Sequence, residues 1–503
     1  MPNTYFIGVD LGTGSAKATA FSQSLEVLKS YSKAYPLNSS QPGYFEQEAE
    51  LIWQAMLECV QKILLYCGSG VLGIGLSSAM HSLLVVDVMG NPLIPVITWA
   101  DLRSESEATT LKLSPQKDIL YQTTGTPIHS MSPLTKIIWL GKHRPELFLY
   151  GNRFISIKSF IWYKLFGVFE EDWSLASATG LFDIVNHKWF EFALKLANIS
   201  KEQLPEPVPT GHFKTHPNRE VLNYMGLLES VPWVIGASDG CLAHLGSSIL
   251  QAGTASLTIG TSAAIRISST FPVYDNERMI FNYILDEQNF IIGGALNNGG
   301  NVLDWGLRNF SNREIFLEKK DENRMEAYFK EIVKIPDGSN GLLFLPYLSG
   351  ERSPIWDEKA SGVFLGIKIS HNSGHFMRSI VEGICFAIHD VHESLENCGL
   401  KINQIHISGG FTVSPIWVQI LANILGKNLV IPLRADASSF GATLMAMKAL
   451  GYISSYEEVQ NLSIQNSFVT NFEIHKFYQI GYRIYKKAYQ DLKMSLHEIH
   501  DWK

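Results

Sequence analysis

A short pattern that occurs twice, nearly half the chain apart, most strongly constrains what this sequence can fold into. Near the N-terminus the apolar run Tyr5–Val9 leads into the turn Asp10–Ser15, and a second strand-like run, Ala16–Phe21, follows. The segment Ser256–Ile267 repeats this order, with its turn at Gly260-Thr261-Ser262. Strand, glycine-rich turn and strand make a β-hairpin. Two copies at this separation favour two related domains.

Between and after the hairpins, helix-like and strand-like segments alternate. The apolar residues of Glu48–Tyr66 fall on one helical face, and the strand-like run Val71–Ser77 follows. In the second half a long amphipathic helix is predicted over Phe376–Leu395, then a strand over Ile405–Ser408 and a helix over Pro415–Leu425. We expect the tail after Tyr452 to form terminal helices. This alternation predicts an α/β fold with layered architecture.

The composition excludes several classes of protein. Of the 503 residues, 46% are hydrophobic and 18% are charged, which excludes intrinsic disorder. The chain has 41 Lys and Arg against 48 Asp and Glu, so it lacks the basic surface of a general nucleic-acid or membrane-surface binder. Its five cysteines are scattered, and its N-terminus shows no signal-peptide pattern. We therefore expect a soluble, cytoplasmic protein with neither nucleic acid nor membrane as a partner.

The turn of the first hairpin is suited to phosphate. Gly12 and Gly14 allow the backbone to approach phosphate oxygens closely, and the N–H groups of the turn can point at the anion. Thr13 and Ser15 add hydroxyl donors. Because a similar turn occurs again at Gly260, the two hairpins could hold one triphosphate between them.

Two charged residues flank this turn. Asp10, at the end of the first strand, is placed to hold Mg²⁺ directly or through water. Lys17, in the second strand, can offset phosphate charge. The alternative is an ordinary hairpin with a solvated Asp, since hairpin turns commonly use Asp and Gly.

Two further motifs have both a functional and a structural interpretation. Ser408-Gly409-Gly410 with Ser414 could contact a nucleotide where a strand ends and a helix begins, or it could be only a tight turn. Asp239, in Gly236–Gly240, could take a proton from a substrate hydroxyl, or it could be a turn former.

Polar and aromatic residues suited to a polyol follow other predicted strands. Met80-His81, Trp99–Arg103 and His129 lie in such loops. Carboxylate and guanidinium groups bind hydroxyls, and an indole packs against C–H groups. Each residue taken singly is as readily structural, and His81 and His129 are not spaced as metal ligands.

Taken together and in this order, the motifs resemble those of the FGGY carbohydrate kinases. The resemblance extends from about Tyr5 to Gly451. It is carried by Asp10–Ser15, Pro42–Gln47, Ala79–Ser82, Trp99–Arg103, Gly236–Gly240, Gly260–Ser262, Gly350–Pro354 and Ser408–Gly410.

The resemblance implies two actin-like, ribonuclease-H-like ATPase domains with a cleft between them. Residues 1–246 would carry the sugar site and the first phosphate hairpin, and residues 247–503 the second hairpin, the adenosine site and the terminal helices. The implied cofactors are ATP and Mg²⁺, with Asp10 as the metal ligand and Asp239 as the general base. The implied ATP contacts are Gly12, Thr13, Gly14, Ser15, Lys17, Gly260, Thr261, Gly300, Asp304, Gly409, Gly410 and Ser414. The implied sugar contacts are Met80, His81, Trp99, Asp101, Arg103 and Asp239.

Within the family, three segments resemble the gluconate kinases: Ser78–Ser82, Thr98–Ser104 and Gly125–Leu134. The departure is Ser130, where that group usually has Pro. The expected partner is a small sugar or sugar acid, with D-gluconate favoured, xylulose as the alternative, and a homodimer left open. A filament or chaperone ATPase of the same fold is disfavoured, because it needs no polyol pocket.

A gluconate carboxylate would need a cation or fixed donors. The candidates are Arg103, Lys136, Lys158 and His129. Arg103 could grip the carboxylate through two parallel hydrogen bonds, or it could pair locally with Asp101 or Glu105 and only shape the loop.

Overall fold

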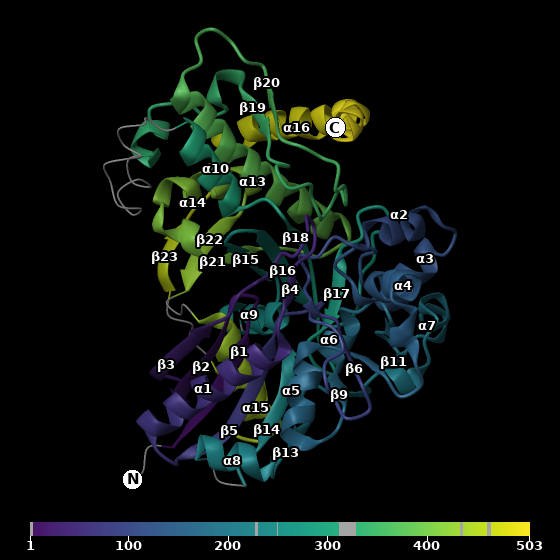
Figure 1. The fold of residues 1–503 in the computed structure, drawn as a ribbon. Coiled ribbons are helices and arrows are strands. Elements are labelled where there is room, and N and C mark those ends of the chain that lie inside the picture. Colours follow the sequence, from purple (N-terminus) through teal and green to yellow (C-terminus); the bar gives the residue numbers. More distant parts are fainter. Residues whose placement is uncertain are drawn as a thin grey trace. The chain divides into compact units, whose positions relative to one another are not determined.

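The computed structural model describes residues 4–226, 230–248, 250–310, 328–432, 436–459 and 464–502 (Figure 1). The chain forms two compact units. The first contains Met1–Gln251, Ser268–Ile292 and Asp436–Asn461, and the second contains Ala252–Ile267, Gly293–Ala435 and Leu462–Lys503. Each unit therefore gathers separate stretches of the chain. The division of the sequence into domains 1–246 and 247–503 stays a prediction.

The first unit is built on a mixed sheet with the strand order β13-β14-β5-β1-β2-β3. These strands are β13 (Phe213–Lys214), β14 (Trp233–Ser238), β5 (Val71–Ser78), β1 (Tyr5–Leu11), β2 (Ser15–Ser22) and β3 (Val27–Ala34). The three central strands β14, β5 and β1 are parallel, and β2 returns antiparallel to β1, which forms the first predicted hairpin.

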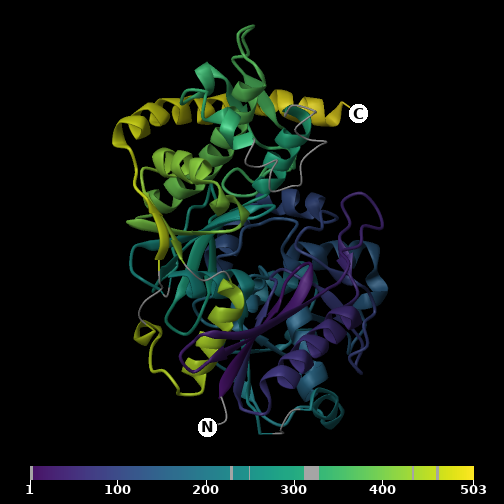
Figure 2. The ribbon, with the colours of Figure 1, turned by 90° about the vertical axis from the view of Figure 1, so that its left-hand side faces the viewer.

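Two helices cover opposite faces of this sheet, α1 (Ala49–Cys67) and α15 (Ala437–Ala449), as Figure 2 shows. Alternate residues of a strand point to opposite faces. Ile7 and Val9 of β1 share a hydrophobic core with α1. Between them, a Cβ atom on Gly8 would lie only 1.9 Å from the backbone oxygen of Ser439. Glycine at this position therefore lets the backbone of α15 pack directly on the sheet.

The first unit contains further short strands and helices. Its further strands are β4 (Glu46–Gln47), β6 (Leu84–Val86), β7 (Val96–Ile97), β8 (Arg153–Ile155), β9 (Glu170–Asp172), β10 (Phe182–Asp183), β11 (Lys188–Trp189), β12 (Glu206–Val208) and β17 (Phe281–Ile284). Its further helices are α2 (Glu105–Leu113), α3 (Lys117–Thr124), α4 (Pro133–His143), α5 (Ile157–Phe166), α6 (Trp173–Ser177), α7 (Glu191–Ala197), α8 (Arg219–Met225) and α9 (Asp239–Ser248).

The other sheet has seven strands in the order β17-β18-β16-β15-β21-β22-β23, and the six strands after β17 match the first sheet read from its β3 end. These strands are β18 (Phe290–Leu296), β16 (Ala263–Ser269), β15 (Thr254–Ile259), β21 (Gln404–Ser408), β22 (Asn428–Pro432) and β23 (Ile464–Phe468). The strands β15, β21 and β22 are parallel, and β16 is antiparallel to β15. Each of these six strands thus has a counterpart in the first sheet, which confirms the predicted duplicated α/β architecture.

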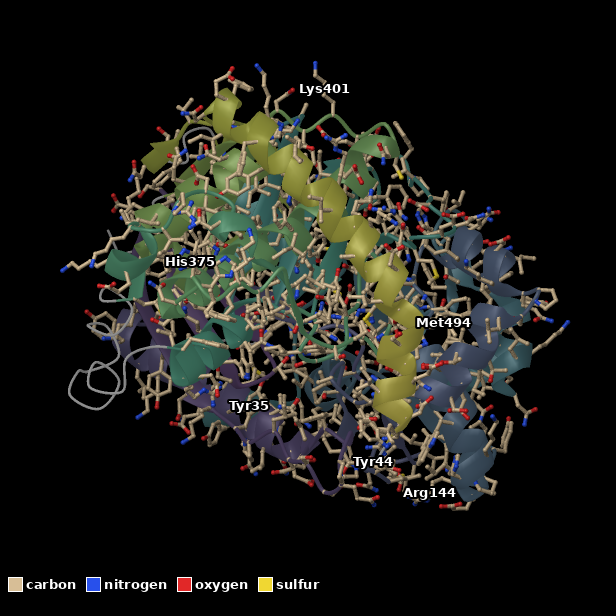
Figure 3. All side chains as sticks on the ribbon, turned by 90° about the horizontal axis from the view of Figure 1, so that it is seen from above. Tyr35, Tyr44, Arg144, His375, Lys401 and Met494 are labelled. Atoms are coloured by element: carbon tan, nitrogen blue, oxygen red, sulfur yellow. The ribbon has the colours of Figure 1, made fainter. Side chains whose placement is uncertain are left out.

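Helices and short strands complete the second unit. They are α10 (Gly300–Phe310), β19 (Leu343–Leu345), β20 (Val363–Leu365), α13 (Ser373–Asn397), α14 (Pro415–Leu425) and α16 (Phe472–Asp501). Figure 3 shows α16 from above, running across the other elements of this unit. Buried tyrosines of α16 bond to α13: Tyr478 donates to Glu382 over 2.8 Å and Tyr482 donates to Asp390 over 2.9 Å.

The prediction for the tail was wrong in one respect. Besides a single long helix, α16, the tail forms the strand β23, which pairs antiparallel with β22. Its sequence, Ile464–Phe468, is polar and largely exposed, so it carries no strand signal of its own. The edge of the sheet supplies the hydrogen bonds that make it a strand.

Among the described helices, none is long and apolar enough to cross a membrane.

Candidate active site

The predicted residues of the first unit gather at one edge of its sheet. The parallel strands β1, β5 and β14 end at the same edge, which is where open α/β sheets bind ligands. Asp10 lies near the end of β1, His81 follows β5, and Asp239 follows β14 directly. In the sheet register Asp10 lies opposite Ser77. The structure thus brings together a proposed metal ligand, a proposed sugar contact and a proposed base.

Asp10 has a strongly perturbed environment. Its Oδ1 accepts a hydrogen bond from the Ser77 hydroxyl over 2.6 Å. Burial, and then the negative charges of Asp239 and Asp436, raise the pKa of Asp10 from 3.8 to about 7, although the Ser77 bond and Lys17 oppose this shift. A carboxylate held among like charges favours a nearby cation. This environment fits the predicted role of Asp10 at a metal site.

Asp436 belongs to this site although sequence reasoning missed it. It lies directly before α15, and its Oδ2 accepts from Lys17 Nζ and from the Thr19 hydroxyl, each over 2.8 Å. Lys17, which we expected beside the phosphates, is therefore tied to the start of α15. Asp436 and Lys17 lie far apart in the sequence, so no local pattern could have indicated the pair.

The turn of the first hairpin is held from two sides. The backbone oxygen of Thr13 accepts from Gln47 Nε2 over 2.6 Å, and its hydroxyl accepts from Trp99 Nε1 over 2.9 Å. A Cβ atom on Gly14 would meet nothing within 4 Å, so the turn has open space beside it. Trp99 thus positions the turn through its indole N–H, a contact that the sequence did not indicate.

His81 is fixed in an unusual conformation. Its backbone has φ 64°, a left-handed value that is uncommon outside glycine. Its Nδ1 donates to the backbone oxygen of Ala178 over 2.7 Å, and its Nε2 lies 3.2 Å from the Tyr283 hydroxyl. The neighbouring Met80 lines a small pocket together with Trp99. Such strain persists where surrounding contacts hold it, and it often marks a functional loop.

Asp101 and Arg103 bind each other. The Arg103 guanidinium makes two bonds of 2.8 Å to the two carboxylate oxygens of Asp101, and one of 2.5 Å to Glu46. It also stacks 4.0 Å from the ring centre of Tyr44, and Asp101 accepts from the backbone N–H of Phe45. These contacts favour the local alternative, in which Arg103 shapes the loop. The direct sugar contacts of Asp101 and Arg103 stay predictions.

The other candidates for a carboxylate contact also have protein partners. Lys136 is fully buried and donates to the backbone oxygens of His81 and Thr98, each over 2.7 Å, and burial lowers its pKa to about 7. Lys158 is equally buried and pairs with Asp172 over 2.7 Å. His129 Nδ1 accepts from the backbone N–H of Met131.

In the second unit the equivalent hairpin lies against the start of α10. The N–H groups of Gly300 and Asn301 donate to the backbone oxygens of Gly260 and Thr261, over 2.7 and 3.2 Å. A Cβ atom on Gly300 would lie 2.6 Å from the Gly260 oxygen. Glycine is therefore needed at residue 300 for the helix to approach the turn. Asp304 lies one turn further along α10 and is exposed.

The paired glycines after β21 differ from each other. Gly409 has φ 108°, and a Cβ there would lie 2.1 Å from the backbone oxygen of Ile259. Gly410 faces open space, with nothing within 4 Å of a Cβ. Ser414 caps α14 by accepting from the backbone N–H of Trp417. Only Gly410 thus presents an open surface, while Gly409 and Ser414 shape the turn. Their predicted ATP contacts remain untested.

The first unit offers few side chains that could hold a metal. Among the described residues there is no group of three His, Cys, Asp or Glu side chains that could hold an ion. Mg²⁺ commonly uses one or two carboxylates together with waters and substrate phosphates, so a single carboxylate does not argue against it. Asp10, crowded by like charges, fits this mode.

This duplicated fold has a glycine-rich hairpin in each half. A model described as the FGGY family of carbohydrate kinases, N-terminal domain, matches residues 5–246, and the C-terminal-domain model matches residues 255–450. A gluconokinase of Bacillus subtilis (strain 168) is 37% identical over 462 residues, 91% of this chain and 90% of that protein. The chain belongs to the FGGY family of carbohydrate kinases.

Solved structures agree with this assignment. A ligand-bound xylulose kinase from Lactobacillus acidophilus matches this chain with a TM-score of 0.92 and 29% sequence identity. The match covers 99% of this chain and 100% of the xylulose kinase chain. A gluconate kinase from the same organism has the same TM-score and identity, covering 99% of each chain. The predicted family and fold are confirmed. The protein is a phosphotransferase with an alcohol group as acceptor.

Proposed function

We propose that this chain transfers the γ-phosphoryl group of ATP to the 6-hydroxyl of D-gluconate, giving 6-phosphogluconate. The placement of Asp10 and Asp239 at the same edge of the sheet, at the ends of the parallel strands β1 and β14, supports phosphoryl transfer. The choice of gluconate rests on the gluconokinase relative at 37% identity and on the segments Ser78–Ser82 and Gly125–Leu134.

Asp239 is the proposed general base. It is the first residue of α9, and the backbone N–H of Gly240 donates to its Oδ1 over 2.7 Å. The positive end of a helix dipole stabilises a carboxylate. An ionised Asp239 can orient the substrate hydroxyl and accept its proton. In phosphoryl transfer, positioning and charge stabilisation account for most of the catalysis.

Asp10 is the proposed ligand of Mg²⁺. When bound, the ion would offset the negative charge that develops on the phosphoryl group. Lys17 is tied to Asp436, so we propose that it acts by fixing β2 against the start of α15 as much as by its charge. We propose the ATP contacts named from the resemblance for both units, with the open glycines Gly14 and Gly410 nearest to the nucleotide.

The carboxylate of gluconate needs donors of its own. Arg103, Lys136 and Lys158 already have protein acceptors at hydrogen-bond distance. We therefore propose that fixed neutral donors of the sugar loops bind the carboxylate. A hydrogen bond between a charged and a neutral group is sufficient for this, being worth about 1.5–3 kcal/mol.

Xylulose is the alternative substrate, because the two Lactobacillus acidophilus kinases fit this fold equally well. An ADP-release assay with gluconate, xylulose, glycerol, ribulose, fuculose and rhamnulose tests the assignment. The expected result is the highest kcat/KM for gluconate. If xylulose were turned over better than gluconate, the assignment of gluconate as substrate would be wrong. If none of these sugars led to ADP release, the whole group of proposed substrates would be wrong.

A further inference from the structure

A network of buried polar side chains in the first unit binds the end of β14, directly before Asp239. Its members are Lys158 on α5, Asp172 at the end of β9 and Ser174 on α6, and all three are fully buried. The elements α6 and β9 contact β14, and α5 contacts β9 (Figure 1). Asp239, which begins α9, is only partly buried. The network thus connects the interior of the unit to the proposed base.

The strand β14 is irregular just before this point. It pairs with β5 on one side, where the register shifts between Val234 and Ala237. On its other side, the described strand β13 reaches no further than Val234. Within the irregular stretch Gly236 has φ 71°, and a Cβ there would lie 1.8 Å from the backbone oxygen of Leu76. Such irregularities often occur beside active sites, where they redirect the side chains that follow.

Beyond the end of β13, side chains bind the backbone of β14. Lys158 Nζ donates to the backbone oxygen of Ala237 over 2.9 Å. The Ser174 hydroxyl accepts from the backbone N–H of Ser238 over 3.1 Å, and it donates to the Ser238 hydroxyl over 3.0 Å. Buried backbone groups need such partners. The two residues before Asp239 are therefore held by side chains from α5 and α6.

Lys158 is itself held in place by Asp172. Its Nζ donates to Asp172 Oδ2 over 2.7 Å, while Asp172 Oδ1 accepts from the backbone N–H of Leu175 on α6 over 2.9 Å. A buried ion pair contributes little net stability, because the cost of desolvation offsets the attraction. An apolar pair of similar size could fill the same space, but it could not bind the Ala237 oxygen. The pair is therefore explained by geometry rather than by stability.

We propose that Lys158 and Ser174 are positioning residues for phosphoryl transfer, which fix the end of β14 so that the Asp239 carboxylate is aimed at the substrate hydroxyl. The inference rests on the proposed role of Asp239 as general base. Both residues act through the backbone of β14, so neither has to touch the sugar or ATP. Because a displacement of about 1 Å can cost about 100-fold in rate, losing these bonds should lower kcat more than substrate affinity.

Ser174→Ala provides the first test, because it removes both bonds to Ser238 without leaving a buried charge unpaired. In the full-length enzyme kcat should fall at least about 10-fold, while KM for ATP stays within a few-fold. The sugar is gluconate, or the one that proves best in the ADP-release assay. The control is Leu222→Ala on α8, which removes a buried side chain of the same unit. It should lower thermal stability but leave kcat unchanged. If the two variants lose stability alike and both keep kcat, Ser174 has only a structural role.

The same substitution in the Asp239→Asn enzyme shows which residue Ser174 acts through. Once the carboxylate is gone, there is no base to aim, so Ser174→Ala should lower kcat in the unmodified enzyme but hardly at all in Asp239→Asn. Equal losses in both backgrounds would overturn the positioning role while leaving Asp239 as the base. Full turnover in Asp239→Asn would instead overturn the proposed base itself. The failures of the two proposals are thus distinguishable.

A double variant tests Lys158. Lys158→Met alone would leave the Asp172 carboxylate buried without its partner, which strongly destabilises a protein. Lys158→Met combined with Asp172→Asn removes both charges, and the amide oxygen can still accept from Leu175. We expect kcat to fall at least about 10-fold with KM for ATP nearly unchanged, because the Ala237 oxygen loses its donor. If the double variant folds and keeps full turnover, Lys158 has no positioning role. If it does not fold, Ser174→Ala decides the proposal.

Discussion

At the position where β1 carries Asp10, the equivalent strand β15 carries Thr258. Both residues lie two positions before the first glycine of their hairpin turn, and both face a serine of the neighbouring parallel strand. Asp10 accepts from Ser77 over 2.6 Å, and the hydroxyls of Thr258 and Ser408 lie 3.0 Å apart. The two hairpins have the same backbone arrangement, and each has a side-chain hydrogen bond at this position. Only the first hairpin has a charged side chain there.

The comparison suggests that the two hairpins have different chemical roles. The first hairpin lies beside Asp239 and Asp436, which raise the pKa of Asp10. The second hairpin has neutral hydroxyls at the equivalent place and packs its turn against α10. We infer that the first copy supplies metal and proton chemistry, and that the second supplies backbone donors for the nucleotide. The predictions below test this division.

The largest expected effect is at Asp239. Asp239→Asn keeps the size of the side chain but cannot accept the substrate proton. Turnover should fall about 10²–10⁴-fold while ATP affinity and thermal stability change little. Steady-state kinetics and a nucleotide titration check this. Asp118→Asn, an exposed acid on α3, is the control and should retain full activity. Turnover of Asp239→Asn within a few-fold of the unmodified enzyme would remove Asp239 from the role of base.

The next prediction compares the equivalent positions directly. Asp10→Asn should lower kcat at least about 100-fold and change the Mg²⁺ dependence for every sugar alike, since a metal contact is worth several kcal/mol. Thr258→Val should cost about 1–3 kcal/mol of stability, because Ser408 loses its partner, but only a few-fold in kcat. Magnesium titrations and denaturant unfolding distinguish the two. Equal losses of kcat would contradict the division of roles.

The stability of the metal-free protein should depend on the ionisation of Asp10. Its pKa is about 7 in the folded state against 3.8 ordinarily, so the folded state favours the protonated form. This contribution is fully present below about pH 4 and is lost as the pH rises through 7. Between these values the free energy of unfolding should fall by several kcal/mol relative to Asp10→Asn. Denaturant unfolding in a chelator, at pH 4 and pH 8, measures it. Parallel curves for the two proteins would contradict it.

Alanine substitutions at the glycines of the two hairpin turns and of α10 should have smaller effects, on stability or on ATP binding. Gly14→Ala and Gly260→Ala each add a methyl group in open space, so we expect unchanged stability and weaker ATP binding. Gly300→Ala would place its methyl 2.6 Å from a backbone oxygen and should cost about 1–3 kcal/mol of stability. Thermal unfolding and nucleotide titrations check these outcomes. If Gly14→Ala left ATP affinity intact, the first turn would not approach the phosphates.

The smallest expected effect is at Arg103. Because it binds Asp101 and Glu46, Arg103→Met should loosen the loop and raise KM about 10-fold for gluconate and for any neutral polyol alike. Arg144→Met, which removes an exposed pair with Glu146, is the control. A KM that rises much more for gluconate than for neutral polyols would show that Arg103 reaches the carboxylate after all.

The sequence predicted those parts of the fold that depend on local pattern. The helix predicted over Pro415–Leu425 has these bounds in the structure, and the one predicted over Phe376–Leu395 lies within α13. Periodic apolar residues and terminal caps are local signals, so they need no knowledge of distant contacts. The strand β23 had no such signal, because the edge of a neighbouring strand decides its conformation.

For the site, the sequence determined which residues are candidates for chemistry, and the tertiary structure decided which partners their side chains have. Asp10 could be named because it ends an apolar strand before a glycine-rich turn, and His81 and Asp239 could be named from the resemblance of their motifs to those of the family. The bonds of Lys17 to Asp436 and of Trp99 to Thr13 could not be, because they join residues that only the order of strands and helices brings within 3 Å. The residues of a turn are adjacent in the sequence, so the turn can be recognised from a short segment. The partner of a polar side chain depends on which distant segment packs beside it.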